Sequence, residues 1–213
     1  MFSFEAWWQI LTTKLPVFFQ GVGTTVELAL YTAIFGTLLG IVVALLRMSK
    51  VKLLKVLAGA YIEFLRGTPL LVQVLIVFYG LPQMGIKLPR MTAGTVALVI
   101  NSAAYMAEIV RSGIQAIDGG QTEASRSLGM NGAQTMIYII LPQAIKNILP
   151  AIGNEFVSII KESSILYTIG IYELTYQANK LASTNFRYLE TLTISALIYF
   201  VLTFTASRLL GML

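Results

Sequence analysis

Two stretches of this chain place amide, hydroxyl and carboxylate side chains at helical spacing inside long apolar runs. Asn101, Tyr105 and Glu108 stand at i, i+4 and i+7, which puts them on one face of a helix. A carboxylate in the hydrocarbon region of a membrane costs at least about 2.5 kcal/mol, so this face needs a polar cavity or a polar partner. Two interpretations stay open: the face contacts a ligand, or it is a hydrogen-bonded seam between helices in which Glu108 pairs with Arg111.

A second polar face lies further along the chain. Glu155, Ser158 and Glu162 share one side of a predicted helix, and Lys161 lies off it. With Glu108 opposite, these carboxylates would form an acidic cavity, which favours a guanidinium or ammonium group. For Glu162 the alternative is a place at the outer interface beside Lys161, whereas Glu155 lies well within the apolar run.

The other carboxylates in apolar runs have simpler interpretations. Glu63 and Arg66 stand at i and i+3, so they are predicted to pair with each other. They lie beside Pro69, whose missing backbone donor predicts a kink or a partial break. Glu27 and Glu190 fall near the outer ends of their runs, where they reach water, and they are assigned no role.

Composition excludes several classes of protein. The 213-residue chain is 56% hydrophobic and 12% charged, about half the charged share of a soluble domain. It contains no cysteine and no histidine, which excludes disulfides, thiol catalysis and the common zinc sites. Its basic residues do not alternate with aromatic ones as in nucleic-acid-binding proteins. The chain also lacks a P-loop, so any ATP that drives this protein binds to another subunit.

The apolar runs predict an all-α integral membrane protein with one domain over residues 1–213. Five spans are expected, at about 21–46, 56–81, 91–116, 141–160 and 188–210. The segment before the first span, which contains Trp7 and Trp8, is expected to lie at the membrane interface.

The placement of lysine and arginine predicts the orientation in the membrane. The stronger set of cations follows the first and third spans and is assigned to the cytoplasm: Arg47, Lys50, Lys52, Lys55, Arg111, Arg126 and Lys146. The weaker set belongs outside: Lys14, Lys87, Arg90, Lys180 and Arg187. The protein is therefore expected in the cell membrane, with its N-terminus outside and its C-terminus in the cytoplasm.

A short polar segment, at about residues 121–132, is expected to form a helix on the cytoplasmic face. Its spacing is similar to the coupling motif of ATP-binding-cassette importer permeases, Glu-Ala-Ala-x3-Gly-x9-Ile-x-Leu-Pro. The matching residues are Glu123, Ala124, Gly129, Ile139, Leu141 and Pro142. Ser125 stands where the motif has its second alanine, which keeps the position small.

Three further segments, residues 63–73, 101–114 and 161–166, resemble polar amino-acid permeases of this class. In the last one, Glu162 and Ser163 replace the Asp and Thr of the family's Lys-Asp-Thr-Ser-Leu segment. The resemblance implies a type I importer permease with five spans that acts as a dimer, most like permeases for arginine, histidine or lysine. It also implies two cytoplasmic ATPase subunits, which hold ATP and Mg²⁺, an extracytoplasmic amino-acid-binding protein and a second, identical permease.

The mechanism that the resemblance implies is alternating access, with the polar segment seated in a groove of the ATPase. The expected substrate contacts are Asn101, Tyr105, Glu108, Glu155, Ser158, Glu162 and Ser163. The expected ATPase contacts are Glu123, Ala124, Ser125 and Gly129. The main alternative is a proton-coupled secondary carrier that uses Glu108 or Glu155, although such a carrier has no need of the coupling motif. A purely structural membrane subunit is less consistent with the polar faces.

Overall fold

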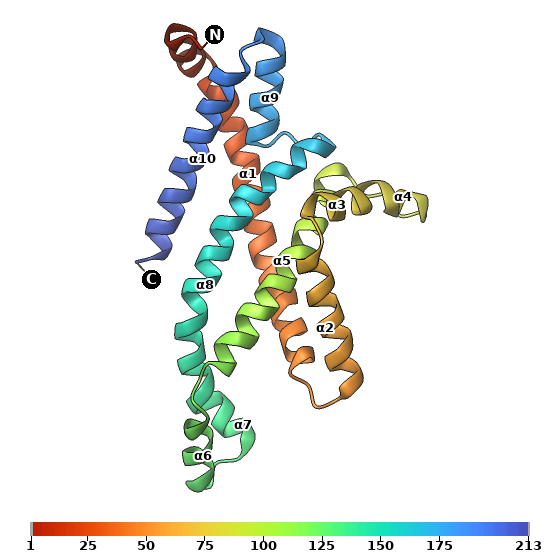
Figure 1. The fold of residues 1–213 in the computed structure, drawn as a ribbon, viewed down its shortest axis with the longest axis vertical. Helices are drawn as coiled ribbons and strands as arrows, with labels where there is room; N and C mark the ends of the chain where they lie inside the picture. The colour runs from red at the N-terminus through yellow and green to blue at the C-terminus, as the bar shows by residue number, and fades with distance from the viewer. Residues whose placement is uncertain (1, 213) are drawn as a thin grey trace.

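The computed structural model describes residues 2–212, which form an elongated helical bundle with no strand (Figure 1). The long helices are α1 (Phe4–Arg47), α2 (Lys52–Gly67), α5 (Arg90–Gln115), α8 (Leu141–Glu162) and α10 (Tyr188–Leu210). The short ones are α3 (Leu70–Leu75), α4 (Leu81–Gln83), α6 (Gly119–Ser127), α7 (Gly132–Gln134) and α9 (Leu174–Asn185). Two π-helical segments, η1 (Ile76–Gly80) and η2 (Thr135–Ile140), and a 3-10 segment, η3 (Ser163–Ile169), complete the chain.

The apolar helices confirm the predicted class of an all-α membrane protein. Four stretches are long and apolar enough to cross a membrane: Phe4–Arg47, Arg90–Gln115, Gly132–Ile169 and Tyr188–Leu210. The pair Lys52–Gly67 and Leu70–Gln83, bent by 108°, brings the number to as many as five.

The first and fourth spans extend beyond the ranges that the sequence predicts. The first helix begins at Phe4, because Ser3 caps its N-terminus and Pro16 does not end it. In the fourth span, helical structure begins before Leu141, since η2 immediately precedes the Leu141-Pro142 pair. The π-helical segment η1 likewise precedes Leu81-Pro82. Proline lacks a backbone donor, and widening the preceding turn lets the helix continue past it.

The centre of the bundle is a close contact between α1 and α5. Gly36 and Gly40 of α1 face Ser102 and Ala103 of α5, and a Cβ at Gly40 would lie 3.0 Å from the Ala103 carbonyl oxygen. Small residues allow the two backbones to approach, which increases the packing contacts that hold membrane helices together. These helices therefore form a fixed frame for the rest of the chain.

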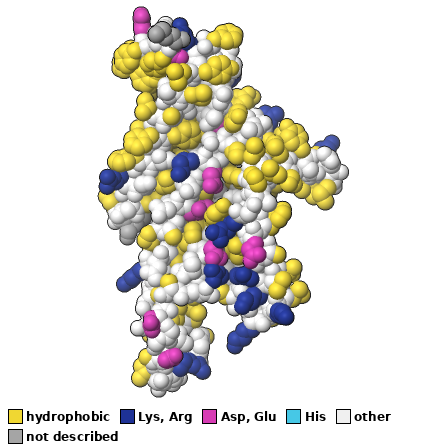
Figure 2. All heavy atoms as spheres, in the orientation of Figure 1, with side chains coloured by type: hydrophobic (Ala, Val, Ile, Leu, Met, Phe, Trp, Pro, Cys, Tyr) yellow, Lys and Arg dark blue, Asp and Glu magenta, His cyan; other side chains and the backbone are white. Residues whose placement is uncertain are grey.

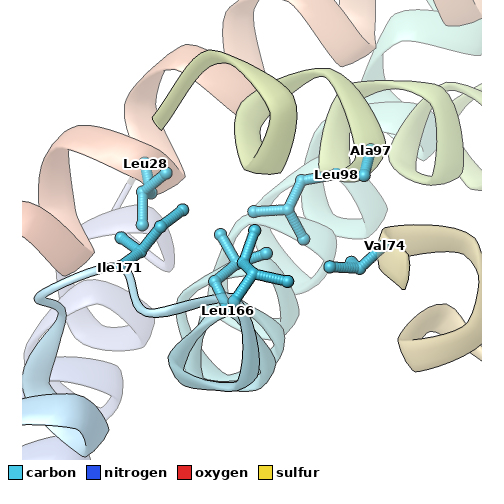
Figure 3. Close-up of a cluster of buried hydrophobic side chains, with 7 residues drawn as sticks. Leu28, Val74, Ala97, Leu98, Leu166 and Ile171 are labelled. Atoms are coloured by element: carbon cyan, nitrogen blue, oxygen red, sulfur yellow. The ribbon is translucent and has the colours of Figure 1, made fainter. Parts of the chain in front are cut away.

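A second core joins the bent span to this frame (Figure 3). Leu28 of α1, Val74 of α3, Leu98 of α5, Leu166 of η3 and Ile171 are each at most 4% exposed and pack together. The cluster holds α3 against α5 and η3, so the segment after the bend packs inside the protein.

The bend itself is stabilised by two amide side chains. In a continuous helix the Leu65 carbonyl would accept from the N–H of residue 69, but that residue is proline. The Gln73 Nε2 donates to the Leu65 oxygen at 2.8 Å and to the Thr68 oxygen at 3.1 Å. The Asn101 Nδ2 donates to the Gln73 Oε1 at 2.9 Å and to the Leu65 oxygen at 3.4 Å. The carbonyl freed by Pro69 is thus satisfied by α3 and α5.

Replacing Gln73 by Leu should lower the thermal stability of the full chain in lipid. The Leu65 carbonyl would lose its shorter hydrogen bond at a buried place, which costs about 1–3 kcal/mol. Gln20→Leu, at an exposed glutamine of α1, is the matched control and should have little effect. Combining Gln73→Leu with Asn101→Leu should cost less than the sum of the single changes, since both belong to one network. Additive losses in thermal unfolding would contradict this account.

Candidate functional site

The predicted acidic face of α8 lies beside α5, near the middle of the bundle. Glu155 is partly buried, and the charged groups that act on it are Glu162 of the same helix and Arg66 of α2. Figure 2 shows acidic and basic side chains gathered in the middle of this face of the molecule. Glu155 and Glu162 therefore lie on the same side of α8, as their spacing of seven residues predicts.

The Arg66 side chain does not make the predicted pair with Glu63. Glu63 instead lies 3.7 Å from the Arg47 guanidinium, and the Arg66 guanidinium lies over the Tyr105 ring, 5.3 Å from its centroid. The prediction of a Glu63–Arg66 pair is wrong because α1 ends beside α2 and presents Arg47 to the same carboxylate. Arg66 is left stacked on an aromatic face, an arrangement that stabilises a guanidinium without neutralising it.

The polar face of α5 acts as a seam over part of its length. Glu108 pairs with Arg111, which donates to both of its carboxylate oxygens. Asn101, which is 4% exposed, is engaged at the bend of the second span. Both contacts match the seam interpretation, and a substrate contact by Asn101, Tyr105 or Glu108 stays a prediction.

Three serines border this region and differ in their hydrogen bonds. Ser102, which the sequence analysis missed, is 2% exposed and lies close enough to Glu155 to donate to its carboxylate, although its hydroxyl forms no hydrogen bond of regular geometry within residues 2–212. Ser163 is fully buried, and its hydroxyl donates to the Ile160 carbonyl at 2.8 Å, so it caps the end of α8. Ser158 is partly buried. The buried Ser102 hydroxyl can thus donate to Glu155 and still accept from a molecule bound there.

A further buried carboxylate, Glu173, caps the N-terminus of α9. It accepts from the backbone N–H groups of Thr175 and Tyr176 and from the Tyr199 hydroxyl at 2.6–2.9 Å. Burial raises the pKa of the Glu173 carboxyl above its ordinary value, and these three donors oppose that shift. The Leu174 N–H donates to the Thr25 hydroxyl, so α9 is tied to both α1 and α10. The two backbone donors stand at the i+2 and i+3 spacing of an N-cap, whereas the Tyr199 donor comes from a distant helix and could not be predicted from local sequence.

The predicted coupling segment lies at the far end of the molecule from α9 (Figure 1). Its helix spans Gly119–Ser127 in place of the predicted 121–132. It starts earlier because the Asp118 side chain accepts from the Gly120 N–H, and it ends earlier because Gly129 has φ +82°. The segment is therefore a short helix followed by a left-handed turn.

One side chain of this segment is hydrogen-bonded to the following π-helical segment, and several others are exposed. The Ser125 hydroxyl accepts from or donates to Thr135 Oγ1 at 3.0 Å, and both residues are 3% exposed. Glu123 and Ala124 are exposed, and so is Leu128, at 83%. An apolar side chain this exposed at the tip of a polar helix suits insertion into a partner, and sequence analysis missed it.

Ser125→Ala should loosen the coupling segment locally. The buried Thr135 hydroxyl would lose its partner, which costs about 1–3 kcal/mol, and amide hydrogen exchange across residues 119–135 should accelerate. Ser127→Ala is the control, because the Ser127 hydroxyl is exposed and bonds only within its own helix. Equal acceleration in both variants would show that the Ser125–Thr135 bond does not hold the segment.

Comparison with known proteins places this geometry among transport proteins. The family described as "binding-protein-dependent transport system inner membrane component" matches residues 36–213. The arginine transport system permease protein ArtQ of Bacillus subtilis (strain 168) is 42% identical over 190 residues, which are 89% of this chain and 87% of that protein. The probable glutamine ABC transporter permease protein GlnM of the same organism is 41% identical over 199 residues, covering 93% and 92%.

Solved structures agree in fold. A crystal structure of an amino acid ABC transporter with histidines has a TM-score of 0.93 at 49% identity, covering 100% of this chain and 97% of that chain. An inward-facing structure of the MetNI methionine ABC transporter has a TM-score of 0.72 at 18% identity, covering 93% and 96%. The second likeness concerns the fold alone.

Proposed function

We propose that this chain transports a basic amino acid, which binds at Glu155 and Glu162. The chain belongs to the family of binding-protein-dependent transport system inner membrane components and is an amino-acid permease subunit of an ABC importer. The observation that carries the proposal is the carboxylate pair. Both side chains are partly buried and lie on one face of α8. Two like charges in a partly desolvated place are unfavourable unless a cation joins them.

The ion pairs among residues 2–212 leave this carboxylate pair available. They join Arg47 to Glu63, Arg111 to Glu108 and Arg187 to Glu190. A guanidinium or ammonium group of a substrate would therefore be the partner that Glu155 lacks, and the Ser102 hydroxyl could accept from it. The relatives alone do not choose the substrate, because one is named for arginine and another for glutamine.

The energy source in this proposal is a separate ATPase. Two ATPase subunits, holding ATP and Mg²⁺, would seat the exposed side of α6 through Glu123, Ala124 and Leu128 on the cytoplasmic side. A second, identical permease and an extracytoplasmic amino-acid-binding protein would complete the importer. This orientation puts the N-terminus outside and the C-terminus in the cytoplasm, in agreement with the distribution of lysine and arginine.

Alternating access would then connect the two ends of the molecule. Closure of the ATPase would move the coupling segment, and the spans would open toward the loaded binding protein. Membership of a binding-protein-dependent family favours this mechanism over the proton-coupled carrier, which would use Glu108 or Glu155 as a proton relay.

Glu155→Gln should reduce transport of arginine or lysine roughly ten- to a hundredfold, because a charge-assisted contact worth about 1.5–3 kcal/mol is lost. Transport of a neutral amino acid should change much less. Uptake of both substrates by proteoliposomes, with the ATPase, the binding protein and ATP supplied, gives the comparison. Glu27→Gln, at an exposed carboxylate of α1, is the charge-matched control and should leave both rates unchanged. Equal losses for basic and neutral substrates would make Glu155 a structural residue.

Substitutions at Gly129 should affect ATPase coupling according to the backbone conformation that each residue tolerates. A Cβ at this glycine would meet nothing within 4 Å, but its φ of +82° is costly for most residues. Gly129→Val should therefore lower ATP hydrolysis stimulated by the loaded binding protein, whereas Gly129→Asn should keep most of it. Both variants should insert normally. If Asn is as harmful as Val, close contact with the ATPase, and not the left-handed turn, sets the requirement.

A further inference from the structure

A cavity of about 390 Å³ lies where α1, α2 and α5 meet, at the ends nearer the coupling segment. Its lining comprises Arg47, Met48, Lys55, Arg111 and Gln115. Three of these five residues are cations, and each comes from a different helix. Figure 2 shows the same concentration of basic side chains over the lower part of α2. The volume is in the range of sites that hold small ligands.

The positive charge around this cavity is only partly neutralised. Glu108 pairs closely with Arg111. Arg47 has Glu63 at 3.7 Å, but that carboxylate is 77% exposed, so solvent weakens the attraction. Lys55 takes part in none of the ion pairs within residues 2–212. An anion in the cavity would therefore meet Lys55 outside any ion pair, whereas Arg47 is shared with the exposed Glu63 and lies within reach of the Glu108 charge.

The position of Arg47 is built into the fold. Its Nη1 donates to the Lys55 carbonyl at 3.1 Å, which fixes the guanidinium across the start of α2. The same side chain lies against Gly59, where a Cβ would overlap the guanidinium. Gly59 thus leaves the space that Arg47 occupies, and the cation is held in place by contacts with two turns of α2.

The start of α2 adds a second feature that favours an anion. The N-cap residue Val51 offers no side-chain hydrogen bond, and the first turn contains Lys52 and Lys55 but no acidic residue. The backbone N–H groups and the dipole at a helix N-terminus favour negative charge, so lysines there are unfavourable on their own. Of the two lysines, Lys55 lines the cavity, so an anion bound there would lie near the favourable end of the α2 dipole.

We propose that this cavity binds a phosphate group. The Arg47 guanidinium supplies paired donors for phosphate oxygens, and Lys55 adds a mobile ammonium. One source of this group is an anionic phospholipid head group, because basic pockets between membrane helices suit such head groups. The other source is free phosphate in solution. The site is separate from the Glu155 face and does not depend on which amino acid is transported.

The test measures binding of two probes to the full chain, purified with the subunits that accompany it. In one arm, phosphatidylglycerol is titrated into phosphatidylcholine nanodiscs and retained lipid is counted by native mass spectrometry. In the other arm, inorganic phosphate is titrated in detergent by calorimetry. Saturable binding of the lipid alone assigns the site to a head group, whereas binding of inorganic phosphate assigns it to a free anion.

Two variants and a control locate the bound group in the cavity. Lys55→Gln should weaken binding about fivefold, the effect of one cation near a phosphate. Gly59→Ala should also weaken it, although the charge is unchanged, because Arg47 is displaced. Lys50→Gln, at an exposed lysine that does not line the cavity, should leave binding unaltered. Absence of binding by both probes, or equal weakening by Lys50→Gln and Lys55→Gln, would overturn the proposal.

Discussion

A carbonyl group in the interior of a membrane protein must find a donor, and the Leu65 carbonyl cannot find one in its own helix. Pro69 removes the N–H that would reach it, and no water is at hand in the hydrocarbon region to replace it. Gln73 and Asn101 supply the missing donors from α3 and α5. This one requirement joins both halves of the second span to the third, so the 108° bend is fixed by contacts on each side of the break.

The geometry of the candidate site follows from that junction. Arg66 is next to Leu65, and Tyr105 lies one helical turn after Asn101, so holding Leu65 close to Asn101 brings the guanidinium over the aromatic ring. The junction therefore sets a stacked cation on α2 across from the carboxylates of α8. Under the proposed function, opposite charges of this kind suit an amino acid, whose own carboxylate and amino groups differ in sign.

The spans were accessible to sequence analysis because apolar length and the position of basic residues are local properties. The Glu155–Glu162 face was accessible for the same reason, since a spacing of seven residues decides it. The partner of Glu63 was not, because Arg47 is sixteen positions away and reaches it only through the packing of α1 on α2. The role of Gln73 could be predicted only in part. Pro69 shows that the Leu65 carbonyl lacks its helical donor, but it does not show which side chain donates instead. The environment of Ser102 and the bond from Tyr199 to Glu173 depend on tertiary contacts.

The helical stretch from Gly132 to Ile169 joins the proposed coupling segment directly to the proposed substrate site. Its first part, η2, is bound to the coupling helix through Ser125 and Thr135, and its later part, α8, carries Glu155 and Glu162. A displacement of α6 would thus be transmitted along one continuous stretch, with the π-helical turns before Pro142 as its most adaptable part. By contrast, α9 is tied to α1 and α10 by Glu173 and Thr25. In the proposed mechanism, motion of the coupling helix would reach the carboxylate pair along α8 and would also reach α5, which residues 116–118 join to α6.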